Sequence, residues 1–169
     1  MLISERLNQA INQQVANELG ASLQYLHIAA YFEEETLPNL AQFFHMQSAE
    51  EHAHAMKFVD FIIETGGKVQ IPEVPAQLAD FESALETAKL GLKWENEVTA
   101  QVYELVNIAL EDKNHIAKNF LDWFVNEQLE EVSMMSDLVN LLKRASERDL
   151  LLIDSMVLNL RPTEGTAPA

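Results

Sequence analysis

Apolar residues recur every three or four positions along four long stretches of this 169-residue chain. That spacing is typical of one buried face of an α-helix. We therefore predict helices at about residues 4–36, 39–65, 81–112 and 115–145, followed by a short apolar helix at 147–160. No stretch alternates as a strand would, so we expect an all-α fold. At 1.5 Å per residue, each long helix would extend about 40–50 Å.

The connections between these helices indicate their topology. Pro38 lies in a short link, so the first two helices should be antiparallel neighbours. Gly66-Gly67 ends the second helix, and the link that follows carries Pro72 and Pro75. This link is long enough to run the length of a bundle. We therefore predict a four-helix bundle with one long crossover connection and a short C-terminal fifth helix, forming one domain over residues 1–160 with a tail at 161–169.

Polar residues interrupt the inner stripe of every predicted long helix. In the stretch AEEHAHAM, alternating steps of three and four residues select Glu51 and His54 as core-facing and exclude Glu50 and His52. The other three helices each carry one glutamate near the middle of the inner stripe: Glu18, Glu95 and Glu131. Glu97 points away from Glu95 by about 200° of helical rotation.

Buried carboxylates are costly unless a partner or a metal compensates their charge. No Lys or Arg lies on the four inner stripes, so a pair of divalent or trivalent cations is the simplest compensation. Carboxylates with a single imidazole suit iron or manganese, and zinc less specifically. The Glu51-x-x-His54 spacing puts both side chains on one face. A lone motif of this kind is a weak signal, but acids on all four stripes are a much stronger one.

These residues predict a division of roles at the metal pair. Glu51 would bridge the two ions, with Glu18 and His54 on one of them. The second ion would take Glu95 and Glu131, as the remaining inner carboxylates. Two further residues lie on the same stripes. Gln128 would bind weakly or orient a water, and Tyr25 would hydrogen-bond a ligand or donate an electron.

Composition narrows the classes of partner and compartment. The formal net charge of −16 disfavours nucleic acid and anionic membranes and favours cations or basic proteins, although acidity can also serve solubility alone. The chain has no cysteine, which excludes disulfides and thiolate metal sites. The N-terminus lacks a signal-peptide pattern, and no apolar run is long enough to span a membrane. We expect a cytoplasmic protein.

The sequence resembles the bacterial non-haem ferritins over essentially its whole length. The resemblance rests on Glu18 with Tyr25, Glu51-x-x-His54, the segment E95-N-E-V-T99, and Trp123 followed by E127-Q-L-E-E131. It implies a ferritin-like topology and a homo-oligomeric hollow shell of 24 subunits. Such a shell would oxidise Fe(II) with O2 or H2O2 at a di-iron ferroxidase centre and store ferric mineral inside.

The resemblance also implies roles for particular residues. Glu18, Glu51, His54, Glu95, Gln128 and Glu131 are similar to the ferroxidase ligands of this family. Tyr25 and Trp123 are similar to its redox-active neighbours, and a packed aromatic is an equal interpretation of Trp123. The remaining acids resemble a third iron site, although off-stripe acids are usually only solvated: Glu50, Glu127 and Glu130.

Related families match less well. Bacterioferritins carry a second Glu-x-x-His, where this chain has Gln128-x-x-Glu131, and they bind haem through a Met where this chain has His52. We therefore expect no haem. We interpret the remaining histidines as surface or structural residues: His27, His45, His52 and His115.

Two other functions remain open on the sequence alone. A di-iron oxidase or peroxidase acting on a small substrate would bind about two irons and need not form a cage. A metal-free helical interaction module would bind none.

Overall fold

A computed structural model describes residues 1–145 and 149–161 of the chain. Four long helices form the bundle: α1 (Glu5–Glu34), α2 (Pro38–Glu64), α3 (Ala84–Glu111) and α4 (His115–Arg144). A short helix α5 (Leu150–Met156) leads into the 3-10 helix η2 (Val157–Leu160). The described residues contain no strand. The predicted all-α bundle with a crossover and a short fifth helix is confirmed.

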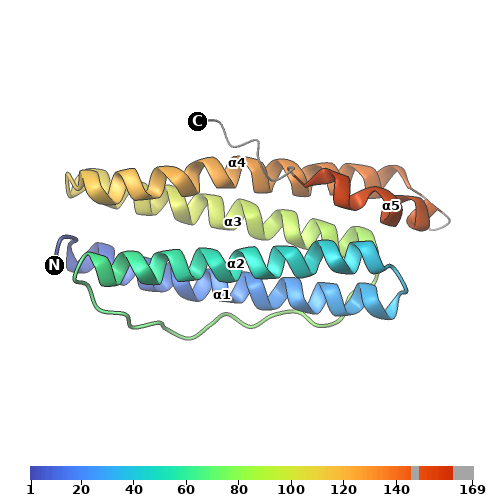
Figure 1. Ribbon diagram of the computed structural model, residues 1–169, viewed down its shortest axis with the longest axis horizontal. Helices are drawn as coiled ribbons and strands as arrows, with labels where there is room; N and C mark the ends of the chain where they lie inside the picture. Colours follow the sequence, from blue (N-terminus) through green and yellow to red (C-terminus); the bar gives the residue numbers. More distant parts are fainter. Residues whose placement is uncertain (146–148, 162–169) are drawn as a thin grey trace.

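The long helices form two antiparallel pairs, α1 with α2 and α3 with α4 (Figure 1). The crossover leaves one end of α2, runs along the whole bundle and starts α3 at the opposite end. Helix α3 begins at Ala84 rather than near residue 81. Ser83 is its N-cap and accepts a hydrogen bond from the Glu86 amide at 3.2 Å, while the Glu86 carboxylate accepts one from the Glu82 amide at 2.6 Å. The expected start of the fifth helix at 147–148 and the tail at 162–169 lie outside the described residues.

Buried amide side chains of α1 hold the crossover against the bundle. Asn12 donates to the Lys68 carbonyl at 2.9 Å and accepts from the Gln70 amide at 2.5 Å. Gln24 makes a similar pair of bonds with the backbone of Leu78, both at 2.8 Å. Because the crossover has no secondary structure of its own, these bonds supply partners that a helix or sheet would otherwise provide.

The hydrophobic core is divided into two clusters of side chains. One cluster includes Tyr25, Phe32 and Phe44, and the other includes Ile11, Phe58 and Phe124. Along each long helix, the glutamates of the inner stripe lie between the residues of the two clusters. A polar layer therefore crosses the middle of the bundle, and the rest of the fold must position it.

Helix α5 folds back over α2 and α4 (Figure 1). Its Asp154 accepts a hydrogen bond from the Leu40 amide at 2.8 Å and another from Asn39 Nδ2 at 3.1 Å. Helix α2 has no side-chain cap of its own, so Asp154 caps its N-terminus from a distant part of the chain. Three large apolar side chains remain exposed on α5: Leu151, Leu152 and Met156.

Replacing Asn12 with Ala tests the role of the buried amides. The substitution leaves the Gln70 amide without its partner and removes one of two side-chain donors to the Lys68 carbonyl, the other being Asn8 Nδ2. We therefore expect a loss of about 1–3 kcal/mol in stability and a fall in Tm of several degrees. Differential scanning calorimetry of the metal-free protein measures this change. Gln13→Ala, on the exposed neighbouring position, is the control and should change Tm little. Equal Tm values for the two variants would contradict the proposed role of Asn12.

Candidate metal centre

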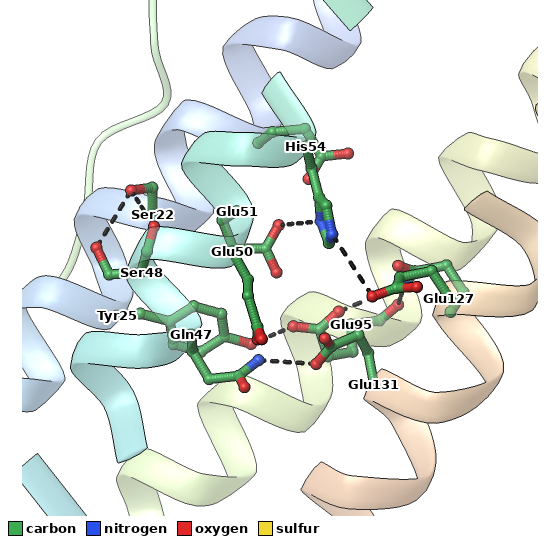
Figure 2. Close-up of polar contacts among 12 residues, drawn as sticks. Ser22, Tyr25, Gln47, Ser48, Glu50, Glu51, His54, Glu95, Glu127 and Glu131 are labelled. Atoms are coloured by element: carbon green, nitrogen blue, oxygen red, sulfur yellow. Dashed lines mark hydrogen bonds and ion pairs between the residues drawn. The ribbon is translucent and has the colours of Figure 1, made fainter. Parts of the chain in front are cut away.

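The polar layer brings together one acidic residue from each long helix, plus a histidine. Glu18 comes from α1, Glu51 and His54 from α2, Glu95 from α3 and Glu131 from α4. Each of the five side chains is at most 4% exposed. The structure therefore brings the five inner-stripe residues into one buried cluster. Figure 2 labels four of them: Glu51, His54, Glu95 and Glu131.

Glu18, Glu51 and His54 form the tightest part of this cluster. Each offers one ligand atom, and these atoms all lie within 4.8 Å of one another. His54 Nδ1 lies 3.3 Å from Glu51 Oε2. Glu18 Oε2 is buried and has no hydrogen-bond partner among the described residues. A buried carboxylate oxygen without a partner is costly, and a cation would remove that cost.

Glu95 and Glu131 are held by neighbouring side chains. The Tyr25 hydroxyl donates to Glu95 Oε1, and Gln47 Nε2 donates to Glu131 Oε2 at 2.7 Å (Figure 2). The Gln128 amide nitrogen lies 3.1 Å from the Glu95 carbonyl oxygen and 3.4 Å from Glu95 Oε2. Gln128 thus stands beside Glu95, on the inner face to which its stripe position assigned it.

Two glutamines on the inner stripes, Gln14 and Gln47, also contact the acids, a role that was not predicted from the sequence. Gln14 donates to Glu18 Oε1 at 2.8 Å, and Gln47 donates to Glu131. Both are buried. They orient carboxylates, as the outer partners of metal ligands do. For Gln14, the sequence did carry a signal for this role: its side chain lies on the inner stripe, one helical turn before Glu18.

Two of the three predicted third-site acids have different described partners. The Glu127 carboxylate reaches His54 Nε2 at 3.8 Å. Glu50 instead pairs with Arg161, a residue that the sequence analysis assigned to the tail. Glu130 is exposed, and no described contact joins it to the other two. No described contact joins the three carboxylates, and the third iron site stays a prediction.

The two predicted redox-active aromatics differ in their surroundings. Tyr25 is fully buried and contacts Glu95. Trp123 is 39% exposed, and its ring centroid lies 5.5 Å from that of His54. The Lys57 ammonium lies 4.2 Å from the Trp123 ring centroid. The four histidines interpreted as surface residues are all exposed: His27, His45, His52 and His115.

The cluster holds protons strongly at its carboxylates. Burial, with a smaller contribution from Glu18, raises the pKa of Glu95 to about 7 despite its bond from Tyr25. Burial and the nearby Glu95 carboxylate raise the pKa of Glu131 to about 8. Burial also raises the pKa of Glu51 well above its usual value. For His54, burial lowers the pKa, but Glu127 and other carboxylates outweigh it and raise the pKa overall.

These shifts follow from several negative groups sharing a space with little water. At neutral pH, protons partly offset the charge that a metal would neutralise. Cations that bind here must displace those protons, so cation affinity should rise with pH. The arrangement is that of a four-helix carboxylate protein with a site for metal ions between its helices.

Comparison with known proteins also indicates a four-helix carboxylate protein. Residues 8–145 match the family described as Ferritin-like domain. The chain is 38% identical over 146 residues to the bacterial non-heme ferritin of Staphylococcus aureus (strain USA300), covering 86% of this chain and 88% of that protein. It is 32% identical to Ferritin BfrB of Mycolicibacterium smegmatis, covering 98% of this chain and 91% of the relative.

Solved structures give the same result. The chain superposes on an open pore ferritin from the hyperthermophilic archaeon Archaeoglobus fulgidus with a TM-score of 0.89 and 34% identity, covering 95% of this chain and 99% of the other. The chain belongs to the ferritin family. Family membership and the buried Glu/His cluster support iron storage with ferroxidase activity. No described helix is both long and apolar enough to cross a lipid bilayer.

The raised pKa values predict how the stability of the metal-free protein depends on pH. The folded state keeps protons on Glu95 and Glu131 at pH values where the unfolded chain, with carboxyl pKa values near 4.5, has lost them. Their stabilising contribution is therefore complete below about pH 4.5 and is lost as pH rises through about 7 and 8. We expect Tm to fall as pH rises from about 4.5 to about 8.

The double variant Glu95→Gln/Glu131→Gln is the matched control, because it keeps the shape but removes both titrations. Its Tm should depend less on pH over the same range. Calorimetry in metal-free buffers measures both proteins. The same pH dependence in the two proteins would contradict the assignment of this effect to the buried carboxyls.

Proposed function

We propose that this chain oxidises Fe(II) at a di-iron ferroxidase centre between its four helices and stores the ferric product in a hollow cage. The observation that carries the proposal is the buried layer of four glutamates and one histidine between two apolar clusters. Its residues fit iron, because they offer hard oxygen ligands and one imidazole. The unpartnered Glu18 oxygen supports a cation at this place.

In this proposal, Glu51 bridges two iron ions. Glu18 and His54 hold one ion, since their ligand atoms lie close to that of Glu51. Glu95 and Glu131 hold the other, and Gln128 stands beside Glu95. Carboxylate oxygens favour the harder ferric ion over the ferrous ion, so this donor set makes Fe(II) easier to oxidise.

The reaction balances with two Fe(II) ions as the electron donors. Together they supply two electrons, which reduce O2 with two protons to H2O2 and leave two Fe(III) ions; with H2O2 as oxidant, the same two electrons and two protons give two water molecules. Iron binding releases protons from carboxyls with raised pKa values, such as Glu131. When O2 is reduced beyond H2O2, two further electrons and two protons convert H2O2 to two water molecules, and in this proposal Tyr25 and Trp123 each supply one electron and one proton. Tyr25 contacts Glu95, and Trp123 lies beside His54.

The oligomeric form belongs to the proposal as well. Leu151, Leu152 and Met156 expose apolar surface on α5, and Leu129 does so on α4. Large apolar side chains exposed together on one short helix, as on α5, are often covered by another subunit. We propose a 24-subunit homo-oligomeric cage in the cytoplasm. The third iron site expected from Glu50, Glu127 and Glu130 stays a prediction.

Glu51→Ala tests the centre most sharply, because Glu51 is assigned to both irons. Stopped-flow absorbance follows Fe(II) oxidation by O2 after the metal-free protein is mixed with increasing iron. The native chain should show a fast phase that saturates near two irons per chain, followed by slow continued uptake. In Glu51→Ala the initial rate of Fe(II) oxidation should fall by at least about a hundredfold. Removing a residue that only hydrogen-bonds to a metal ligand typically lowers activity by about 10- to 100-fold.

Glu97→Ala is the control, since Glu97 lies on α3 but is half exposed and pairs with Lys93. It should keep the native rate. A native rate in Glu51→Ala would refute the bridging assignment. A fast phase without further uptake in the native protein would instead favour a di-iron oxidase acting on a small substrate.

A further inference from the structure

Arg161 reaches the bundle from the far end of the chain. It follows η2, and its side chain is only 9% exposed. Its guanidinium donates to Gln47 Oε1 and pairs with Glu50 Oε1, and its Cζ lies 5.6 Å from the Phe43 ring centroid. These three partners lie in the N-terminal half of α2, so the arginine is bound at a defined place rather than lying free on the surface.

The position of Arg161 is fixed by the segment before it. Asp154 caps α2 through the Leu40 amide, and Ile153 and Val157 are buried against the bundle. Only a few residues separate Val157 from Arg161. The fold-back of α5 and η2 therefore carries the guanidinium to α2, and contacts far from the metal centre hold it there.

Two partners of Arg161 connect it to the centre. Gln47 accepts from Arg161 through its oxygen and donates to Glu131 through its nitrogen at 2.7 Å. Glu50 lies close enough to Glu131 for its charge to contribute to the raised pKa of Glu131. The guanidinium thus sits one side chain away from the centre, against the acid that the third iron site would need.

Arg161 and a third cation compete for Glu50. One Glu50 oxygen pairs with the guanidinium, and the other, Oε2, is buried without a partner among the described residues. A divalent cation bound to Glu50 would stand within a few ångströms of the guanidinium. Like charges at that separation repel each other, although the Glu50 side chain is 41% exposed and the guanidinium alone is largely buried. Binding of a divalent cation to Glu50 therefore opposes the Arg161–Glu50 ion pair, and the ion pair opposes binding of the cation.

We propose that Arg161 is a tethered internal counter-ion that occupies Glu50 and limits the centre to two cations. This inference rests on the proposed di-iron function and deepens it. A third cation binds only when Arg161 leaves Glu50. By linkage, the cost of displacing Arg161 lowers the apparent affinity of Glu50 for a third cation. The residue acts through Glu50 and Gln47, and it touches neither iron nor oxygen.

Zinc binding to the metal-free assembled protein tests this proposal, because Zn²⁺ binds without being oxidised. Isothermal titration calorimetry gives the number of ions per chain and the affinity of each class of site. The native chain should bind about two ions tightly. Arg161→Gln should bind a third ion at least about tenfold more tightly than the native chain does, the size expected for losing one charge-assisted contact.

Companion variants separate competition from a structural effect. Arg161→Lys restores the positive charge and should weaken third-ion binding again. Adding Glu50→Gln to Arg161→Gln removes the contested carboxylate and should abolish the gain. Lys93→Gln removes a positive charge from an exposed site and should leave the zinc titration as in the native chain.

The zinc titrations test the role of Arg161 and the di-iron function separately. Equal third-ion affinity in Arg161→Gln and the native chain would overturn the role of Arg161. So would a gain that persists after Glu50→Gln or that Lys93→Gln reproduces. Fewer than about two tight ions in the native chain would instead overturn the di-iron function. The same titrations also give the third-ion affinity of the native and Arg161→Gln chains, and this difference is independent of the number of tight ions in the native chain.

Discussion

Four carboxylates and one imidazole buried in the middle of a helical bundle are the constraint on which this structure depends. They replace apolar packing at the point where the core should be most continuous, and the two apolar clusters lie to either side. Without cations, the charge is offset by protons held at raised pKa values and by donors such as Tyr25 and Gln47. The site is thus costly when empty and favourable when metal binds, which is the behaviour a binding centre needs.

Packing and hydrogen bonds elsewhere in the bundle offset the free-energy cost of burying these carboxylates. The long helices run past the polar layer in both directions, so each is anchored by aromatic and aliphatic packing above and below it. Gln14 and Gln47 orient two of the acids. The crossover is tied to α1 by Asn12, and α5 caps α2 through Asp154. The fold-back of α5 also brings Arg161 to Glu50, where it links the chain end to the centre.

The helical pattern predicted the bundle and the burial of the five inner-stripe residues, because both depend on local periodicity. Glu51 and His54 could be separated from Glu50 and His52 by helical phase alone, and burial follows that division. The partners of long-range contacts were not predictable in this way. Gln47 lies one turn before Glu51 yet bonds Glu131, and Arg161 lies more than a hundred residues from Glu50. Such pairs depend on how the helices pack and on the path of the fold-back, and sequence spacing encodes neither.

The most direct test of the central claim is the position of iron in crystals. Anomalous scattering measured on both sides of the iron absorption edge, from crystals soaked in Fe(II), locates the metal without assuming its ligands. The account predicts two peaks between the helices, one near Glu18 and His54 and one near Glu95 and Glu131, with Glu51 between them. Iron bound only at the surface, with none inside the polar layer, would contradict it.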